Sequence, residues 1–193
     1  MLEAPASAVL IEAFVNTVDV ELGTDDLTTP AALGAWLVER ELLDAGARVD
    51  AADHETGLRL RAGLREKLGV HVGDAPDPEL VRRADEALRG LPLLFGLGVD
   101  GEPAGLLPSP ELPPVARALA ALAIAWSELV TTGEAARLKR CAEHGCAWVF
   151  WDVSKNRSRR WCSMRVCGNR TKARRYAARQ TQTTKPPSTA GRA

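Results

Sequence analysis

Apolar side chains recur at helical spacing along most of the N-terminal two thirds of the chain. The clearest stripe follows two prolines at 113 and 114 and consists of Val115, Leu119, Leu122, Trp126 and Leu129. Steps of three and four residues predict a long helix that turns one face to the core. Its uninterrupted apolar run, residues 118–126, is nine residues long. A membrane span needs about 20 apolar residues, so we expect a core helix and no membrane segment.

Residues with capping side chains precede several helical stretches. Ser7 stands before an apolar stretch, and the pairs Thr29–Pro30 and Asp77–Pro78 each place a capping oxygen before a proline. Proline is favoured in the first helical turn, and Ser, Thr or Asp just before it accepts a hydrogen bond from a free backbone amide. The sequence therefore predicts helices that begin at these three places.

Two further patterns complete the prediction for this part of the chain. Residues 53–68 mix leucines with charges at helical spacing, which predicts another amphipathic helix. Short apolar runs flank Asp100–Gly101, a dipeptide common in tight turns, and predict a small β-hairpin. We therefore expect a mainly helical N-terminal domain with a small hairpin, covering residues 1–136.

The charges divide the chain near the same boundary. The formal net charge is zero, but residues 137–193 carry 15 Lys and Arg against two acids, and residues 1–136 carry 10 against 23. A basic half of this kind predicts a polyanionic partner. The alternative is that the two halves attract each other within the fold. In that case the acidic domain would compete with nucleic acid for the cationic surface.

All four cysteines lie in the basic part, with the spacing C-x4-C, 15 residues and C-x4-C. They are Cys141, Cys146, Cys162 and Cys167. Two close thiol pairs suit tetrahedral zinc, and the N-terminus shows no export signal of the kind that accompanies disulfide-rich proteins. Four thiolates leave no open position on the ion, so we expect one structural Zn²⁺. Gly145 is available for the bend between the first pair, and His144 is an alternative ligand that fits a loop position better.

This small module has the elements of a zinc ribbon or treble clef. Residues 147–152 are apolar and aromatic and predict a strand, a polar loop follows, and a basic helix is expected from Gly168 or Asn169. The predicted class is α+β, mainly α, with the zinc module at residues 137–181. Residues 182–193 are rich in Thr and Pro and predict a disordered tail.

Residues 137–179 closely resemble the CGNR zinc-finger family. The signature after which the family is named reads here Cys167, Gly168, Asn169 and Arg170. Upstream, the segments FVNTVD (14–19) and DDLTTPAALGAWL (25–37) resemble the ABATE domain that accompanies this finger. The resemblance implies a bacterial transcription regulator, in some descriptions an RNA-binding protein, with the four cysteines as metal ligands and no enzymatic activity. The chain departs from a common form at Ala147, where that form has glycine.

Cations are dense around the second cysteine pair, and residues 154–193 contain no Asp or Glu. Solvated faces normally mix both signs, so a nucleic-acid surface is favoured over a merely solvated helix. Arginine also suits bidentate contact with phosphates or guanine edges. DNA is the preferred partner, with RNA or a protein scaffold as alternatives. The predicted nucleic-acid-binding residues are Arg157, Arg159, Arg160, Arg165, Asn169, Arg170, Lys172, Arg174, Arg175 and Arg179.

A second candidate site lies near the N-terminus. Asn16, Thr17 and Asp19 interrupt an apolar segment and predict a pocket for a small-molecule effector, although such residues commonly form helix-end hydrogen bonds instead. The chain has three histidines and no glycine-rich phosphate loop, nucleophile elbow or HExxH pair. We therefore expect a cytoplasmic protein that is not an enzyme.

Overall fold

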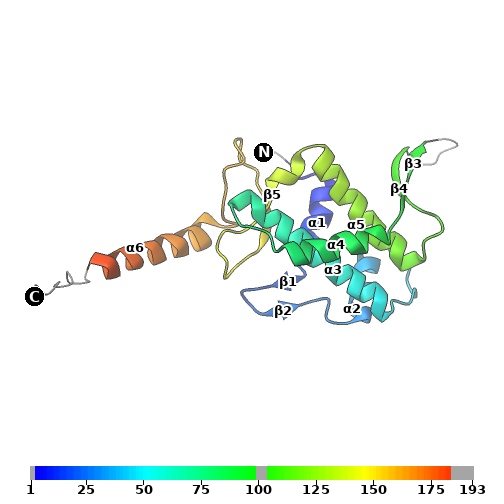
Figure 1. The fold of residues 1–193 in the computed structure, drawn as a ribbon, viewed down its shortest axis with the longest axis horizontal. Coiled ribbons are helices and arrows are strands. Elements are labelled where there is room, and N and C mark those ends of the chain that lie inside the picture. Colours follow the sequence, from blue (N-terminus) through cyan, green and yellow to red (C-terminus); the bar gives the residue numbers. More distant parts are fainter. Residues whose placement is uncertain (1–2, 99–103, 184–193) are drawn as a thin grey trace, which may run out of the picture.

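The computed structural model describes residues 3–98 and 104–183. Within these ranges about half of the residues lie in six α-helices (Figure 1): α1 (Ala6–Val15), α2 (Pro30–Glu39), α3 (Ala51–Gly69), α4 (Pro78–Arg89), α5 (Pro114–Thr131) and α6 (Asn169–Thr183). Three short helical turns connect them: η1 (Val70–Val72), η2 (Glu134–Arg137) and the π-helical η3 (Met164–Gly168). The predicted class, α+β and mainly α, is confirmed.

The strands form two-stranded antiparallel hairpins. They are β1 (Val18–Asp19) with β2 (Thr24–Asp25), β3 (Leu93–Leu97) with β4 (Ala104–Pro108), and β5 (Leu138–Arg140) with β6 (Val149–Trp151). The β3–β4 pair is the hairpin that the sequence predicts around Asp100–Gly101, which itself lies outside the described residues. The predicted strand at 147–152 is also present, as β6. The short β1–β2 pair was not predicted.

Two of the three predicted helix starts are confirmed. Thr29 Oγ1 accepts a hydrogen bond from the Ala32 amide at 3.1 Å, and Asp77 Oδ1 accepts one from the Glu79 amide at 2.8 Å. The prediction for Ser7 is wrong. Pro5 precedes the first turn of α1, and Ser7 lies inside the helix with a buried hydroxyl that has no partner among the described residues. An extended proline begins the helix without a side-chain cap.

The main hydrophobic core is built by α1, α2, α3 and α5. The predicted stripe on α5 confirms the sequence pattern: Val115, Leu119, Leu122 and Leu129 are buried, and Trp126 packs against them partly exposed. The whole of α5 is long and apolar enough to cross a membrane, although the apolar run at residues 118–126 is too short. The core helices of soluble proteins share this length and composition. Helices α3 and α4 pack so closely that a Cβ at Gly63 would lie 2.3 Å from Ala84 Cβ.

The core continues past residue 133 into the C-terminal region. Leu138, Val149 and Trp151 belong to the same buried cluster as the helices. The Asn16 side chain extends the β5–β6 hairpin, because its amide donates to the Val149 carbonyl at 2.8 Å and its oxygen accepts from the Val149 amide at 2.9 Å. The N-terminal helices and the C-terminal hairpin are therefore packed together.

Buried and half-buried cations strengthen this contact. Arg65 on α3 donates to the Val15 carbonyl at 2.5 Å and to the Ala147 carbonyl at 3.0 Å, and burial lowers the pKa of Arg65 to about 10. On β5, Arg140 forms ion pairs with Glu66 at 2.6 Å and Asp74 at 3.2 Å. Helix α6, by contrast, extends away from the body, and the β3–β4 hairpin protrudes at the other end (Figure 1).

Candidate metal centre

The four cysteine sulfurs lie together beside the β5–β6 hairpin. All four Sγ atoms are within 4.8 Å of one another, and the Cys146–Cys162 and Cys162–Cys167 sulfurs are 3.6 Å apart. A tetrahedral zinc ion with Zn–S bonds of about 2.3 Å requires sulfurs about 3.8 Å apart. Cys141, Cys146 and Cys167 are buried, with Phe150 packed against them and Trp148 and Trp161 around. Four cysteines in this arrangement can bind one zinc ion.

The electrostatics of the cluster also favour a cation. Burial raises the pKa of both Cys162 and Cys167, the latter to about 11, and the Cys141 sulfur adds to the rise. Four thiolates this close repel one another, and a divalent ion between them replaces their protons. His144 lies outside the cluster: its imidazole is exposed, with Nε2 3.2 Å from the Asp74 carboxylate.

The first cysteine pair sits in a tight turn. The Cys146 and Ala147 amides both donate to the Glu143 carbonyl, at 2.8 and 2.9 Å, and the chain reverses at Ala147, where φ is 49°. Gly145 lies inside this turn, as predicted, but its φ is not positive, so the turn does not require a glycine there. Left-handed backbone favours glycine, which explains why a glycine suits the position of Ala147.

The second pair spans the π-helical turn η3. Ser163 starts it by accepting a hydrogen bond from the Val166 amide, and Gly168 follows Cys167. A Cβ at Gly168 would lie 2.5 Å from Met164 Sδ, so a larger residue there would require the exposed Met164 side chain to move. Helix α6 begins at the next residue, Asn169, as predicted.

Several of the predicted nucleic-acid-binding residues are bonded within the C-terminal region. Arg159 donates to the Cys162 carbonyl at 2.7 Å and lies over the Phe150 ring, with its Cζ 4.8 Å from the ring centroid. Arg157 instead donates to the carbonyl of Gly133, at the end of the N-terminal region, at 3.1 Å. Arg174 pairs with the buried carboxylate of Glu143. Burial alone would raise the pKa of Glu143, but Arg174 and Thr171 outweigh it and lower that pKa.

Two others bind the N-terminal region. Arg160 donates to the Val72 carbonyl at 2.7 Å, and Arg170 forms an ion pair with Glu21 at 2.9 Å. Arg170 and Glu21 are both partly exposed, and Glu21 stands in the β1–β2 turn. The cationic region therefore uses part of its charge to hold the acidic region.

The remaining members of the predicted set face solvent. Arg165 and Lys172 are exposed and have no side-chain partner among the described residues. Asn169 and Arg179 are exposed as well, and the Asn169 amide donates to the Arg165 carbonyl at 3.0 Å. The side chain of Arg175 lies outside what the structure describes. The sequence predicts that the tail begins at residue 182, but α6 continues to Thr183, and residues 184–193 lie outside the described part of the chain. Arg165 and Lys172 are the most available cations.

Sequence reasoning missed a buried ion pair that shapes the loop between the cysteine pairs. Lys139 Nζ lies 2.8 Å from Asp152 Oδ2 and also donates to the Arg157 and Arg159 carbonyls. Burial alone would raise the pKa of Asp152, but the hydrogen bonds from Lys139 and from the Ser154 and Arg159 amides hold it at about 2. No signal in the basic stretch distinguishes Lys139 from solvent-facing cations.

The candidate effector residues are only partly brought together. Asn16 and Thr17 line a groove on the side of α1, while the Asp19 carboxylate caps the β1–β2 turn by accepting from the Glu21 and Leu22 amides. Thr17 also donates to the Phe14 carbonyl and accepts from the buried Arg61. Thr17 and Asp19 thus make the local hydrogen bonds typical of helix ends and turns, whereas the Asn16 side chain bonds to the distant Val149.

The fold and the sulfur cluster define a zinc-finger protein with an N-terminal helical domain. Residues 8–133 match the ABATE family, described as "putative stress-induced transcription regulator", and residues 137–180 match the CGNR zinc finger. The chain belongs to the ABATE family and carries a CGNR finger. No curated protein matches it in sequence. A zinc finger and a regulator domain in one chain indicate a zinc-binding regulator.

Proposed function

We propose that this protein is a DNA-binding transcription regulator whose zinc centre presents the turn η3 and helix α6 to phosphates. One observation carries the proposal: the last zinc ligand, Cys167, lies in η3 between the exposed Arg165 and a helix on which Lys172 is exposed. Arg165 precedes the ligand and Lys172 follows it, both exposed and without partners among the described residues.

The charge distribution supports a nucleic-acid partner. No acid follows Asp152 in the sequence, and α6 extends away from the acidic helices (Figure 1). A duplex could approach such a helix without meeting the acidic body. Cations of this kind neutralise phosphates and release counterions, and base edges would supply sequence preference.

The proposal includes a location and excludes catalysis. A bacterial cytoplasm, where the nucleoid lies and thiols stay reduced, suits both the partner and a Cys₄ zinc site. Four thiolate ligands saturate the ion, so no position is left for an activated water. The function is binding without enzymatic activity.

The test measures binding of the zinc-loaded protein to a labelled DNA duplex, a matched RNA duplex and both single strands. We expect the DNA duplex to bind tightest, with affinity falling steeply as salt rises. Tighter binding to the RNA duplex or to single-stranded RNA would indicate an RNA-binding protein instead. An affinity independent of salt would favour a protein scaffold and overturn the proposal.

Two variants locate the contact. Lys172→Ala should weaken duplex binding and reduce the magnitude of the log–log salt slope by about 0.9, the value for one phosphate contact on B-DNA. Lys67→Ala, on the distant helix α3, is the matched control and should leave the slope unchanged. An unchanged slope for Lys172→Ala would remove α6 from the interface.

A further inference from the structure

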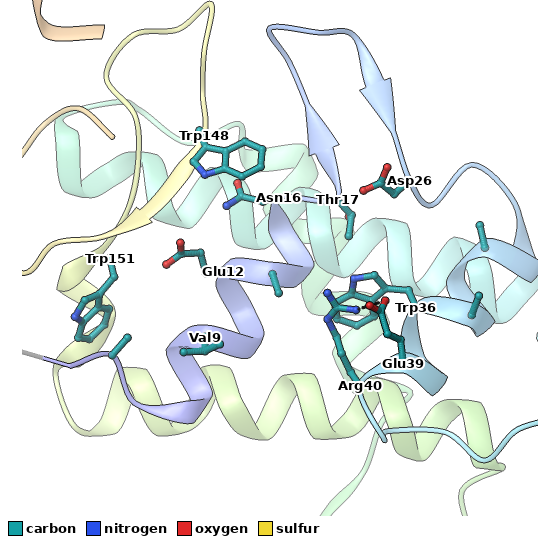
Figure 2. Close-up of a pocket in the computed structure, with 14 residues that line it drawn as sticks. Val9, Glu12, Asn16, Thr17, Asp26, Trp36, Glu39, Arg40, Trp148 and Trp151 are labelled. Atoms are coloured by element: carbon teal, nitrogen blue, oxygen red, sulfur yellow. Dashed lines mark hydrogen bonds and ion pairs between the residues drawn. The ribbon is translucent and has the colours of Figure 1, made fainter. Parts of the chain in front are cut away.

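The N-terminal helices and the zinc-binding region border an open groove that the proposed function does not use. It has a volume of about 940 Å³ and is lined from α1, α2 and β6 (Figure 2). In Figure 2, Glu12 of α1 points toward the side where Trp148 and Trp151 lie, while Trp36, Glu39 and Arg40 occupy the other side. Ligand pockets commonly have volumes of about 300–1,000 Å³ and lie between domains.

The groove carries unbalanced negative charge. Three carboxylates line it, those of Glu12, Asp26 and Glu39, against one cation, Arg40. Glu39 and Arg40 already pair with each other at 2.9 Å. Glu12 and Asp26 have no ion-pair partner among the described residues. Burial raises the pKa of Glu12, and the Trp151 backbone amide offsets this only in part. A half-buried carboxylate with so little compensation would gain from a cation beside it.

Apart from Asn16 and Thr17, the remaining lining is aromatic and apolar. Three indole rings line the groove, those of Trp36, Trp148 and Trp151, together with Val9 and alanines of α1 and α2. The guanidinium of Arg40 lies over the Trp36 ring, 4.3 Å from its centroid. That contact is an example, within this groove, of a cation packed against an indole face. A ligand with only a charge would leave the other rings without contact.

We propose that this groove binds an organic monocation, an amine or guanidinium on an apolar body, with the charge beside Glu12 and the body against the tryptophans. An anion would meet two unpaired carboxylates, and a neutral molecule would leave Glu12 uncompensated. The proposal goes beyond nucleic-acid binding and does not depend on it, because the groove lies apart from Arg165 and Lys172.

The test uses three probes of matched shape: 2-phenylethylamine, 2-phenylethanol and 3-phenylpropanoate. Calorimetry at neutral pH measures their binding to the full-length zinc-loaded protein, and tryptophan fluorescence reports the site. We expect the ammonium probe to bind with a dissociation constant of about 1 mM or tighter and both other probes to bind at least about tenfold more weakly. Equal binding of the alcohol, tighter binding of the carboxylate, or no binding of any probe at millimolar concentration would overturn the proposal.

Variants then assign the contact. Glu12→Gln keeps the shape and removes the charge, and should weaken the ammonium probe by about tenfold. Asp26→Asn, at an exposed position that cannot disturb the core, should weaken it by about two- to threefold. Glu55→Gln, an exposed carboxylate of α3 outside the groove, is the control and should change nothing. Zinc content and circular dichroism check the fold. Unchanged affinity in both Glu12→Gln and Asp26→Asn would contradict the assignment.

Discussion

Residues 3–133 and residues 137–183 are stabilised by different means. The N-terminal region buries whole faces of apolar side chains, such as Ile11, Phe14, Leu37 and Leu119, and only two of its arginines are buried. The C-terminal region is much shorter, and in it Arg137, Lys139, Glu143 and Asp152 are all buried. Below about 40 residues a hydrophobic core alone rarely supports a fold.

The zinc-binding region is therefore stabilised by three substitutes for a hydrophobic core of its own. The first is the metal centre, the second is a set of buried ion pairs, and the third is a share of the neighbouring core through Leu138, Val149 and Trp151. Each substitute can be removed separately. The predictions below do so, beginning with the largest expected effect.

Loss of the metal should affect the two regions most unequally. Cys162→Ser, or a chelator, removes an ion that contributes about 10–16 kcal/mol in zinc-finger peptides. We expect residues 138–168 to lose amide protection in hydrogen exchange, while α3 and the central turns of α5 keep most of theirs. Ser158→Ala, in the same loop, is the control. Full protection of 138–168 in a protein without zinc would show that the metal is not needed.

The buried ion pair comes next. Lys139→Met removes the partner of Asp152, leaves a buried carboxylate without its cation, and should lower the free energy of unfolding by about 3–5 kcal/mol. Urea denaturation measures this change. Lys155→Met, an exposed lysine of the same region, should shift the midpoint little. If both variants unfold alike, the pair makes no special contribution.

Loss of the hydrogen bonds between Asn16 and Val149, which join the two regions, should have a smaller effect on stability. Asn16→Ala leaves the Val149 amide and carbonyl without their partners and should lower the free energy of unfolding by about 2 kcal/mol. Asn156→Ala, in an exposed loop, is the matched control. Thermal unfolding with separate probes for each region adds a test of coupling: if Asn16 couples them, the two transitions should move apart in the variant. Transitions that stay coincident would assign the coupling to the apolar contacts.

Relieving a strained turn should increase stability, whereas the preceding substitutions should lower it. Ala147 adopts a left-handed conformation, so Ala147→Gly should raise the free energy of unfolding by about 1 kcal/mol. Ala142→Gly, nearby at a residue without positive φ, should give no gain. A loss of stability in Ala147→Gly would show that the methyl group packs favourably enough to offset the strain.

The smallest effect is expected from breaking the ion pair between Arg170 and Glu21. Both side chains are partly exposed, and such pairs contribute about 0.2–1 kcal/mol. If the duplex uses Arg170, Glu21→Gln should strengthen DNA binding roughly two- to fivefold at low salt. Glu111→Gln is the control for net charge. Equal affinity of the two variants would show that the acidic region does not compete for this arginine.

The local signals of the sequence were the most reliable guides to this fold. Thr29 and Asp77 begin helices because a capping oxygen and a following proline act within one turn. The cysteine cluster could be predicted because the spacing of the four cysteines resembles that of a metal site. The prediction for Ser7 is wrong because the helix starts after Pro5, two residues earlier than a hydroxyl cap at Ser7 would require.

Long-range pairings were beyond the reach of the sequence. Asn16 and Val149 are separated by 133 positions, and nothing in either segment identifies the other. Charge counting also does not distinguish surface cations from buried ones: Lys139 is buried, and Arg159 lies over an aromatic ring. The burial of a charge depends on the tertiary partners that compensate it, and these become visible only in three dimensions.

The apolar continuity between the helices and the β5–β6 hairpin has a consequence for modular engineering. A finger transplanted alone onto another protein would carry Val149 and Trp151 as uncovered surface and would lose the pairing that Asn16 gives the strand edge. A successful chimera would have to bring the matching faces of α1 and α3 with it. In this architecture the smallest transferable unit is larger than the stretch that holds the four sulfurs.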